Sequence, residues 1–161
     1  MALIKGTIRY AKDLCLPSMV FTFRPNPISV LTGQPFKPLL SESQKTDILS
    51  GLGLDLLVNY PFDRVFAGIS PDAFMKLIFD DLQCRALTIG EDFRFGKDRE
   101  GDSSMLVKIG KKYGAIVDII DNIELDGEPV SSSRIHKAIA DNDLLLAERL
   151  LGRPLVTYRP A

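Results

Sequence analysis

The alternation of short apolar runs with longer segments of helical periodicity restricts this chain to few folds. Runs rich in β-branched and aromatic side chains predict strands, and each is followed by a polar or proline-containing turn. Because strands that alternate with crossover helices form parallel sheets with right-handed connections, the pattern predicts an α/β fold. Its mostly parallel sheet should be flanked by helices. The predicted strands are residues 18–23, 54–60, 86–89 and 115–120.

Capping residues mark several of the predicted helices. Ser41 and Gln44 fit a capping box, in which both side chains bond free backbone N–H groups at the helix start. Residues 28–40 contain a glycine and two prolines and predict a loop. The predicted helices are residues 2–14, 41–53, 102–113, 133–140 and 143–151, together with one that starts at Ser70 and includes Leu82.

Size and charge narrow the class of protein. A chain of 161 residues with 45% hydrophobic content suits one domain, which we expect to span residues 1–161. With 20 basic and 21 acidic residues the net charge is -1, which disfavours a nucleic-acid partner. No apolar run reaches membrane-spanning length, so no membrane partner is expected. Two isolated cysteines, Cys15 and Cys84, fit reduced thiols in a cytoplasmic protein.

Unusual residues follow three of the predicted strands. Residues 22–27 carry two prolines and an asparagine, residues 60–62 carry a proline between two aromatics, and residues 90–96 contain glycines, acids, phenylalanines and an arginine. Parallel strands end on one side of a sheet, where small ligands bind in open α/β proteins. We therefore expect these segments to converge on one ligand site.

A second candidate site is the serine run before residue 135. Ser131, Ser132, Ser133 and Arg134 stand at the start of a predicted helix. Free backbone N–H groups and the positive end of the helix dipole favour an anion there, and hydroxyls and a guanidinium strengthen that preference. A single serine is also an ordinary helix cap, so the pattern alone leaves a phosphate site and a plain cap both open.

Several of these motifs together resemble one enzyme family. The runs FTFRPNP, PFDRVFAGISPDAF, IGEDFRFGKDREGD, VSSSRI and AERLLGRP are similar, in this order, to the FMN adenylyltransferase (FAD synthetase) module of the bacterial bifunctional riboflavin kinase/FAD synthetase family. The similarity extends over about residues 2–154. It implies the nucleotidyltransferase form of the Rossmann-like fold. It also implies transfer of AMP from ATP, bound with Mg²⁺, to the substrate FMN, which gives FAD and pyrophosphate.

The resemblance implies roles for single residues on the strand ends. The family's G-x-[DN]-F-x-F-G loop matches residues 90–96. It implies nucleotide contacts at Gly90, Asp92, Phe93 and Gly96 and a flavin contact at Phe95. The family's T-F-x-P-x-P run borders the flavin and matches Thr22, Pro25 and Pro27.

The serine run matches the S-S-T of the family's second nucleotide-binding motif. This implies that Ser131, Ser132 and Ser133 hold the ATP phosphates, with Arg134 and His136 as further nucleotide contacts. Asp92, Ser132 and Ser133 receive the catalytic roles, which are positioning and charge stabilisation because phosphoryl transfer of this kind forms no covalent enzyme intermediate. No residue is assigned as a metal ligand.

The sequence departs from the family pattern at two places. His136 stands where the family's S-S-T-x-I-R pattern has arginine, and imidazole lacks the guanidinium fork. The family's module also begins with a strand and a G-x-F-D-G-x-H-x-G-H segment whose histidines contact the ATP phosphates, whereas this sequence matches from the following helix. Without that first strand we expect a gap in the sheet, with unpaired backbone groups, unless a longer N-terminus or another segment fills it.

Two alternatives to FAD synthesis stay open. One is a catalytically impaired flavin- or nucleotide-binding relative that lacks the H-x-G-H histidines. The other is a nucleotidyltransferase of the same fold that acts on pantetheine phosphate or nicotinate mononucleotide. The sequence contains no match to the family's riboflavin kinase module, so a separate riboflavin kinase is the partner that would supply FMN.

Overall fold

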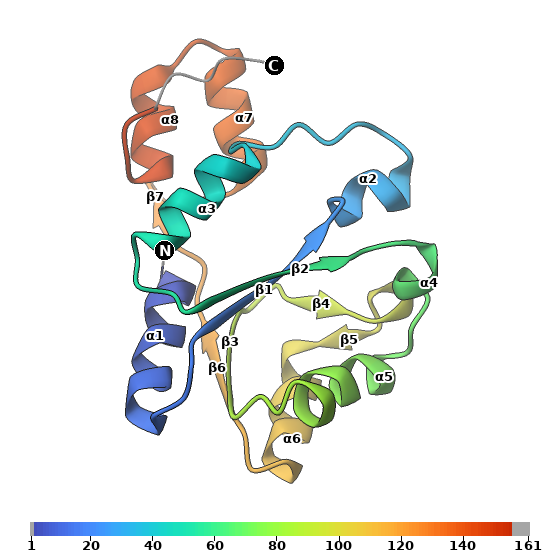
Figure 1. The fold of residues 1–161 in the computed structure, drawn as a ribbon. Coiled ribbons are helices and arrows are strands. Elements are labelled where there is room, and N and C mark those ends of the chain that lie inside the picture. The colour runs from blue at the N-terminus through green and yellow to red at the C-terminus, as the bar shows by residue number, and fades with distance from the viewer. Residues whose placement is uncertain (1, 156–161) are drawn as a thin grey trace. The chain divides into compact units, whose positions relative to one another are not determined.

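Two separate parallel strand pairs form the framework of residues 1–121. The computed structural model describes residues 2–155 and divides the chain into two units, residues 1–121 and 122–161. In the first unit β1 (Met19–Arg24) pairs with β2 (Leu56–Pro61), and β3 (Ala86–Gly90) pairs with β6 (Ile116–Ile120), both in parallel (Figure 1). The predicted α/β class and all predicted strands are confirmed, with ends shifted by one or two residues.

The two pairs are not joined. Across residues 2–155 no strand pairing connects β1 or β2 to β3 or β6. The structure thus has the gap expected for a sheet that lacks a central strand.

Helices cover both faces of the β3–β6 pair. On one face lies α1 (Ala2–Leu14), close enough that a Cβ at Gly6 would come within 3.2 Å of the Thr88 methyl group on β3. On the other face lie α5 (Pro71–Lys76), its π-helical continuation η1 (Leu77–Asp81) and α6 (Ser103–Lys112). Successive strand residues point to opposite faces, so Thr88 meets α1 while Ile89 enters the core under α5 and α6.

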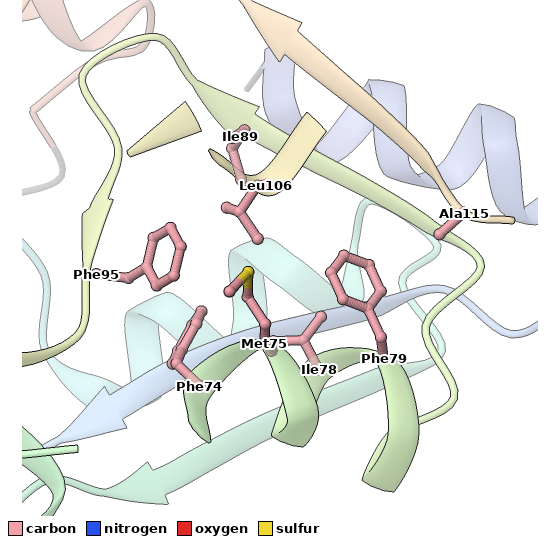
Figure 2. Close-up of a cluster of buried hydrophobic side chains, with 8 residues drawn as sticks. All are labelled: Phe74, Met75, Ile78, Phe79, Ile89, Phe95, Leu106 and Ala115. Atoms are coloured by element: carbon pink, nitrogen blue, oxygen red, sulfur yellow. The ribbon is translucent and has the colours of Figure 1, made fainter. Parts of the chain in front are cut away.

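The core of the first unit gathers around that second face. Figure 2 shows its buried side chains, which come from α5, η1, β3, β4, α6 and the residue just before β6. Leu106 is fully buried and Phe79 is 1% exposed. The members of the cluster are Phe74, Met75, Ile78, Phe79, Ile89, Phe95, Leu106 and Ala115.

One predicted loop is wrong. Residues 28–40 were expected to be irregular, but α2 (Pro27–Thr32) occupies their first part. Asn26 caps this helix by accepting a hydrogen bond from Ile28 N, Pro27 supplies a favourable first residue, and Gly33 ends the helix at φ 69°. The short helix α4 (Arg64–Ala67) is also absent from the prediction. The capping box at Ser41 and Gln44 is confirmed at the start of α3 (Glu42–Ser50).

Short elements complete the two units. In the first, β4 (Arg94–Phe95) pairs antiparallel with β5 (Gly101–Asp102) around a 3-10 turn, η2 (Lys97–Arg99). In the second, β7 (Glu124–Leu125) and β8 (Glu128–Pro129) form a hairpin. Its turn residues, Asp126 and Gly127, both have positive φ, as in a tight primed turn. The helices α7 (Ser132–Ala140) and α8 (Leu144–Leu151) follow and confirm the last two predicted helices.

Candidate functional site

The carboxyl ends of β1 and β2 lie side by side and carry a cluster of aromatic rings. Phe23 is in register with Tyr60, and Phe62 N donates to the Arg24 carbonyl over 3.1 Å. The Phe23 ring centroid lies 5.1 Å from that of Phe62 and 5.4 Å from that of Phe66 on α4. The convergence predicted for residues 22–27 and 60–62 is therefore confirmed.

A lysine that sequence reasoning missed contacts this strand end. Lys45 on α3 donates from Nζ to Thr22 Oγ1 over 3.1 Å, and both residues are half-buried. Thr22 is one of the residues assigned to the flavin side. Its hydroxyl therefore has a cationic donor beside it at that side. Nothing local in the sequence connects positions 23 residues apart. Only the fold brings this pair together.

The other two residues assigned to the flavin side bracket Asn26. Pro25 follows β1 and is exposed, whereas Pro27 is the first residue of α2 and is half-buried. Both therefore stand at the carboxyl end of β1, as predicted. Their contact with a flavin stays a prediction.

The loop of residues 90–96 leaves β3 and turns back as β4. Phe93 N donates to the Gly90 carbonyl over 3.1 Å, which closes the turn. Asp92 is exposed, and Phe93 is half-buried with its ring stacked 5.9 Å from that of Phe95. Phe95 is 5% exposed and packs 5.0 Å from the Phe74 ring, so it belongs to the core (Figure 2). A flavin contact at Phe95 remains a prediction.

The two glycines of this loop differ in whether the fold requires glycine at that position. Gly96 has φ 72°, and a Cβ there would come 2.8 Å from Pro71 N, so the fold itself requires glycine. A Cβ at Gly90 would meet no heavy atom within 4 Å among the described residues, and its φ is not left-handed. The space beside the Gly90 backbone is therefore open. Packing within the protein gives no reason for glycine at this position, whereas close approach of a ligand would.

One cavity joins the ends of β1 and the loop after β3. Phe23 and Phe93 both line a cavity of about 550 Å³ in the first unit. β1 and β3 run in the same direction in Figure 1, so residues 22–27 and 90–96, which follow them, lie on the same side of the strand pairs, as predicted. The carboxyl ends of β1, β2 and β3, with residues 90–96, are called the rim below.

The carboxylate of Asp102, on the strand β5 that pairs with β4, serves local structure. Asp102 caps α6: its Oδ1 accepts from Met105 N and from Ser104 Oγ, each over 2.8 Å. These hydrogen bonds stabilise the carboxylate and hold the pKa of Asp102 below its usual value. Within residues 2–155 no group of three or more His, Cys, Asp or Glu side chains is arranged to hold a metal ion.

The serine run begins α7 in the second unit. Ser131 is the N-cap, and its Oγ accepts from Arg134 N over 3.2 Å. Ser132 and Ser133 are the exposed first residues of the helix, where backbone N–H groups are free of helical partners. His136 is half-buried in the next turn. The placement of these residues at the rim stays a prediction.

Arg134 has a structural task. Its Nη1 donates to the carbonyls of Leu125 and Glu128, both over 2.9 Å, and its Nε lies 3.1 Å from the Glu128 carboxylate. The side chain is 17% exposed. The guanidinium therefore ties the β7–β8 hairpin to α7, and a nucleotide contact through Arg134 stays a prediction.

Within residues 2–155 every helix is too short or too polar to cross a bilayer.

The chain is similar to proteins of one family over most of its length. A family profile described as FAD synthetase matches residues 1–134, which include the whole first unit and the start of α7. Bifunctional riboflavin kinase/FMN adenylyltransferase of Escherichia coli K12 is 34% identical over 155 residues, or 95% of this chain and 50% of that protein. Proteins with the same description from Pseudomonas fluorescens and Haemophilus influenzae are each 35% identical and match 89% of this chain and 47% of their own length. The chain thus spans about half the length of these relatives.

A solved structure shares the fold. A crystal structure of a Streptococcus pneumoniae protein, named as a macrolide-efflux protein, superposes with a TM-score of 0.81. It is 27% identical in sequence, and the match covers 96% of this chain and 50% of that one.

Proposed function

The chain belongs to the FAD synthetase family, and from this premise we propose that it is an FMN adenylyltransferase. A 5′-phosphate oxygen of FMN attacks the α-phosphorus of ATP in line. The new P–O bond forms as the bond to the β-phosphate oxygen breaks, so the products are FAD and pyrophosphate. The observation that carries the proposal is that the family match includes both the 90–96 loop and Ser131–Ser133, the two segments assigned to the nucleotide.

Residues of the rim would bind the nucleotide and the flavin. The open backbone at Gly90 supports close approach of a ligand, and the half-buried Phe93 ring offers an apolar surface to a base. Asp92, exposed beside them, would orient the nucleotide, and Gly96 fixes the return of the loop. Thr22, Pro25 and Pro27 would border the flavin next to the aromatic rings of β1 and β2.

The start of α7 would stabilise the charge of the transferring phosphate. Ser132 and Ser133 add hydroxyl donors to the free N–H groups of the helix N-terminus, and the helix dipole favours negative charge at that end. These donors stabilise negative charge most where it develops in the transition state. They should therefore raise kcat more than they tighten the binding of ATP in the ground state. Ser131 would add less, since its hydroxyl already caps the helix.

Mg²⁺ would arrive with ATP. Magnesium in such reactions is held mainly by substrate phosphates and water with few protein carboxylates, and it neutralises phosphate charge when bound. The chain's own residues would position the phosphates.

We take residues 1–161 as one adenylyltransferase domain, because the family profile continues from the first unit into the second. The relatives are named for riboflavin kinase as well, which supports a riboflavin kinase as the source of FMN. A cytoplasmic location is proposed with it, since both cysteines are free thiols.

His136 favours one second candidate, a binding protein without turnover. If the imidazole does not replace the family arginine, ATP and FMN would still bind but the transferring phosphate would lack a bidentate cationic partner. Calorimetry with FMN and with a non-hydrolysable ATP analogue, beside an assay for pyrophosphate, separates binding from turnover. Binding without pyrophosphate release would favour this candidate.

Incubation of the chain with FMN, ATP and Mg²⁺ tests the activity directly. FAD and pyrophosphate should appear in equal amounts, and pantetheine phosphate or nicotinate mononucleotide in place of FMN should give no adenylylated product. Ser132→Ala and Ser133→Ala should each lower kcat/KM by about tenfold to hundredfold. Ser50→Ala, on the exposed end of α3, is the matched control and should leave it unchanged. Absence of FAD, both from this chain and from a version extended upstream, would reject the proposal.

A further inference from the structure

Lys45 on α3 is the one lysine among residues 2–155 that is not exposed. Its Nζ donates to Thr22 Oγ1, a neutral partner. In the described part of the chain no carboxylate forms an ion pair with it, whereas the half-buried Arg134 lies 3.1 Å from the Glu128 carboxylate. Moving an ammonium group out of water costs free energy unless an opposite charge compensates it. Lys45 is therefore a partly desolvated cation that no side chain of the described chain neutralises.

The contact between Lys45 and Thr22 leaves donors available to a ligand. An ammonium group carries three N–H donors, and this contact uses one of them. The Thr22 hydroxyl accepts in that bond, so its own proton can be donated elsewhere. Two N–H groups and one O–H group thus stand together with one positive charge. A ligand with several anionic oxygens matches such a set.

The strand face that carries Thr22 adds a further polar group. The rings of Phe21, Phe23 and Tyr60 pack together on the other face of the β1–β2 pair. Successive strand residues alternate between faces, so Thr22 and its register partner Asn59 share the face toward α3. Asn59 is exposed, and its amide offers two more N–H donors. The pair therefore has an aromatic face and a polar face with donors for an anion.

The position of this polar face selects between the two phosphate-bearing substrates of the proposed reaction. ATP is assigned to the 90–96 loop and to the start of α7, whereas Thr22 is assigned to the flavin side. From Thr22 to Pro25, which is also assigned to the flavin, the chain advances at most about 10 Å, at about 3.3 Å per residue. The five-carbon ribityl chain of FMN spans a comparable length between its ring and its phosphate. An anion at Thr22 thus suits FMN.

We propose that Lys45 binds the 5′-phosphate of FMN, with the Thr22 hydroxyl and the Asn59 amide as further donors. This inference rests on the proposed function and adds a specificity residue to it. Lys45 contacts phosphate oxygens that do not react, and the remaining oxygen attacks the α-phosphorus of ATP. Riboflavin carries a hydroxyl in place of the phosphate, so it leaves the charge of Lys45 uncompensated. Lys45 therefore makes the site prefer FMN to riboflavin.

Titration of the chain with FMN and with riboflavin, followed by flavin fluorescence, tests this preference without turnover. The wild-type chain should bind FMN at least about fivefold more tightly than riboflavin. Lys45→Met keeps the apolar stem and should reduce this ratio to less than about twofold, because FMN binds more weakly while riboflavin binding is unchanged. Lys45→Arg restores the positive charge and should recover part of the preference.

Two further variants separate a phosphate contact from a structural effect. Thr22→Val keeps the shape of the side chain and suits a strand, but it removes the hydroxyl. It should lower the preference for FMN by about twofold to threefold, since a neutral hydrogen bond is weaker than a charged one. Lys108→Met removes an exposed lysine of α6 and should leave both flavin affinities unchanged.

Several outcomes would overturn the inference. An equal loss of affinity for FMN and riboflavin in Lys45→Met would assign Lys45 a structural role only. Weaker ATP binding with unchanged FMN binding would assign it to the nucleotide. A wild-type chain that does not prefer FMN, or binds neither flavin, would also reject it. A preference for FMN that depends on Lys45, in a chain that forms no FAD, would support the inference and reject the proposed activity.

Discussion

The two parallel strand pairs of the first unit have the same ladder but different surroundings. The β3–β6 pair is covered by α1 on one face and by the core cluster on the other, and Ile89 is 4% exposed. The β1–β2 pair contains no fully buried residue, and Leu56 on β2 is 50% exposed. Backbone hydrogen bonds alone contribute modestly to net stability, whereas buried apolar area contributes strongly. The comparison teaches that the covered pair holds the β3 end of the rim against the core, and that the β1–β2 side depends on a few local contacts.

This difference has a consequence for the proposed site. The 90–96 loop follows directly from the covered pair and is anchored by the buried Phe95 ring, so the proposed nucleotide side of the rim is positioned by the core. The proposed flavin side is attached to β1 and β2, where aromatic contacts and polar bonds take the place of a deep core. The effects of substitutions in the two strand pairs should therefore differ, both in the size of the stability loss and in which ligand is affected.

The largest effect is expected from truncating the core under β3. Leu106→Ala removes a fully buried side chain of α6 and should lower the free energy of unfolding by about 2–5 kcal/mol, because lost transfer energy and a cavity add together. Leu56→Ala makes the same chemical change on the half-exposed β2 and should cost less than about 1 kcal/mol. Urea unfolding of both variants measures the difference. Equal losses would contradict the contrast between the pairs.

A smaller effect is expected from adding a methyl group beside Phe95. A Cβ at Gly101 on β5 would lie 2.6 Å from the Phe95 ring, so Gly101→Ala should force the ring to shift and cost about 1–3 kcal/mol. The proposed nucleotide side should suffer with it, through weaker ATP binding, because the ring anchors the loop. Gly51→Ala is the control, since its Cβ would meet only ordinary contacts of 3.4 Å and longer. Thermal unfolding and ATP titration of both variants test this.

Much of this framework could be predicted from the sequence because its signals are local. β-branched runs identified every strand of the two pairs, and the capping box identified the start of α3. The helix α2 was missed because its apolar stretch is shorter than the periodic pattern that predicts helices, and its cap and proline resembled a turn. The β7–β8 hairpin is absent from the prediction because its strands have only two residues each, too few for a strand pattern.

The residues of the site were less predictable because their surroundings are long-range. The positions of Gly90 and Asp92 at a strand end follow from the local pattern. The burial of Phe95 depends on Phe74, more than twenty residues earlier, and the bonds of Arg134 depend on carbonyls of the preceding hairpin. The contact between Lys45 and Thr22 requires that α3 return to β1. A sequence motif assigns residue types to a site, but only packing decides which of them are already engaged.

The next effect depends on pH and concerns the polar contact at the start of β1. Asp55 Oδ2 accepts from both Ser18 N and Ser18 Oγ over 2.7 Å, which holds the pKa of Asp55 below its usual value. A carboxyl whose pKa is lower in the folded state stabilises the fold above its ordinary pKa of about 3.8, and this contribution fades as pH falls through the lower folded value. Asp55→Asn should therefore lower the urea midpoint at pH 7.

The pH series provides its own control. The difference between the wild-type chain and Asp55→Asn should narrow as the pH is lowered below about 3.8, where the carboxyl becomes protonated in the unfolded state while the folded state, with its lower pKa, still keeps it ionised. Asp102→Asn makes the corresponding change beside the covered pair and should narrow in the same range, because its pKa is also lowered. A difference that stays constant from pH 7 to pH 3 would mean that the amide costs stability for a reason other than charge.

Substitution of Lys45 should have the smallest effect on stability. It nevertheless tests most directly whether the flavin and the nucleotide bind at different ends of the rim. Lys45→Met keeps the apolar stem but removes the donor to Thr22 Oγ1, so the loss should be about 0.5–1.5 kcal/mol, the net value of one hydrogen bond. Because Thr22 lies on the proposed flavin side, KM for FMN should rise several-fold while KM for ATP stays unchanged. Lys108→Met on α6, near the covered pair, is the matched control and should alter neither. A rise in KM for ATP instead would mean that the β1 end serves the nucleotide, and the assignment of the two sides would have to be reversed.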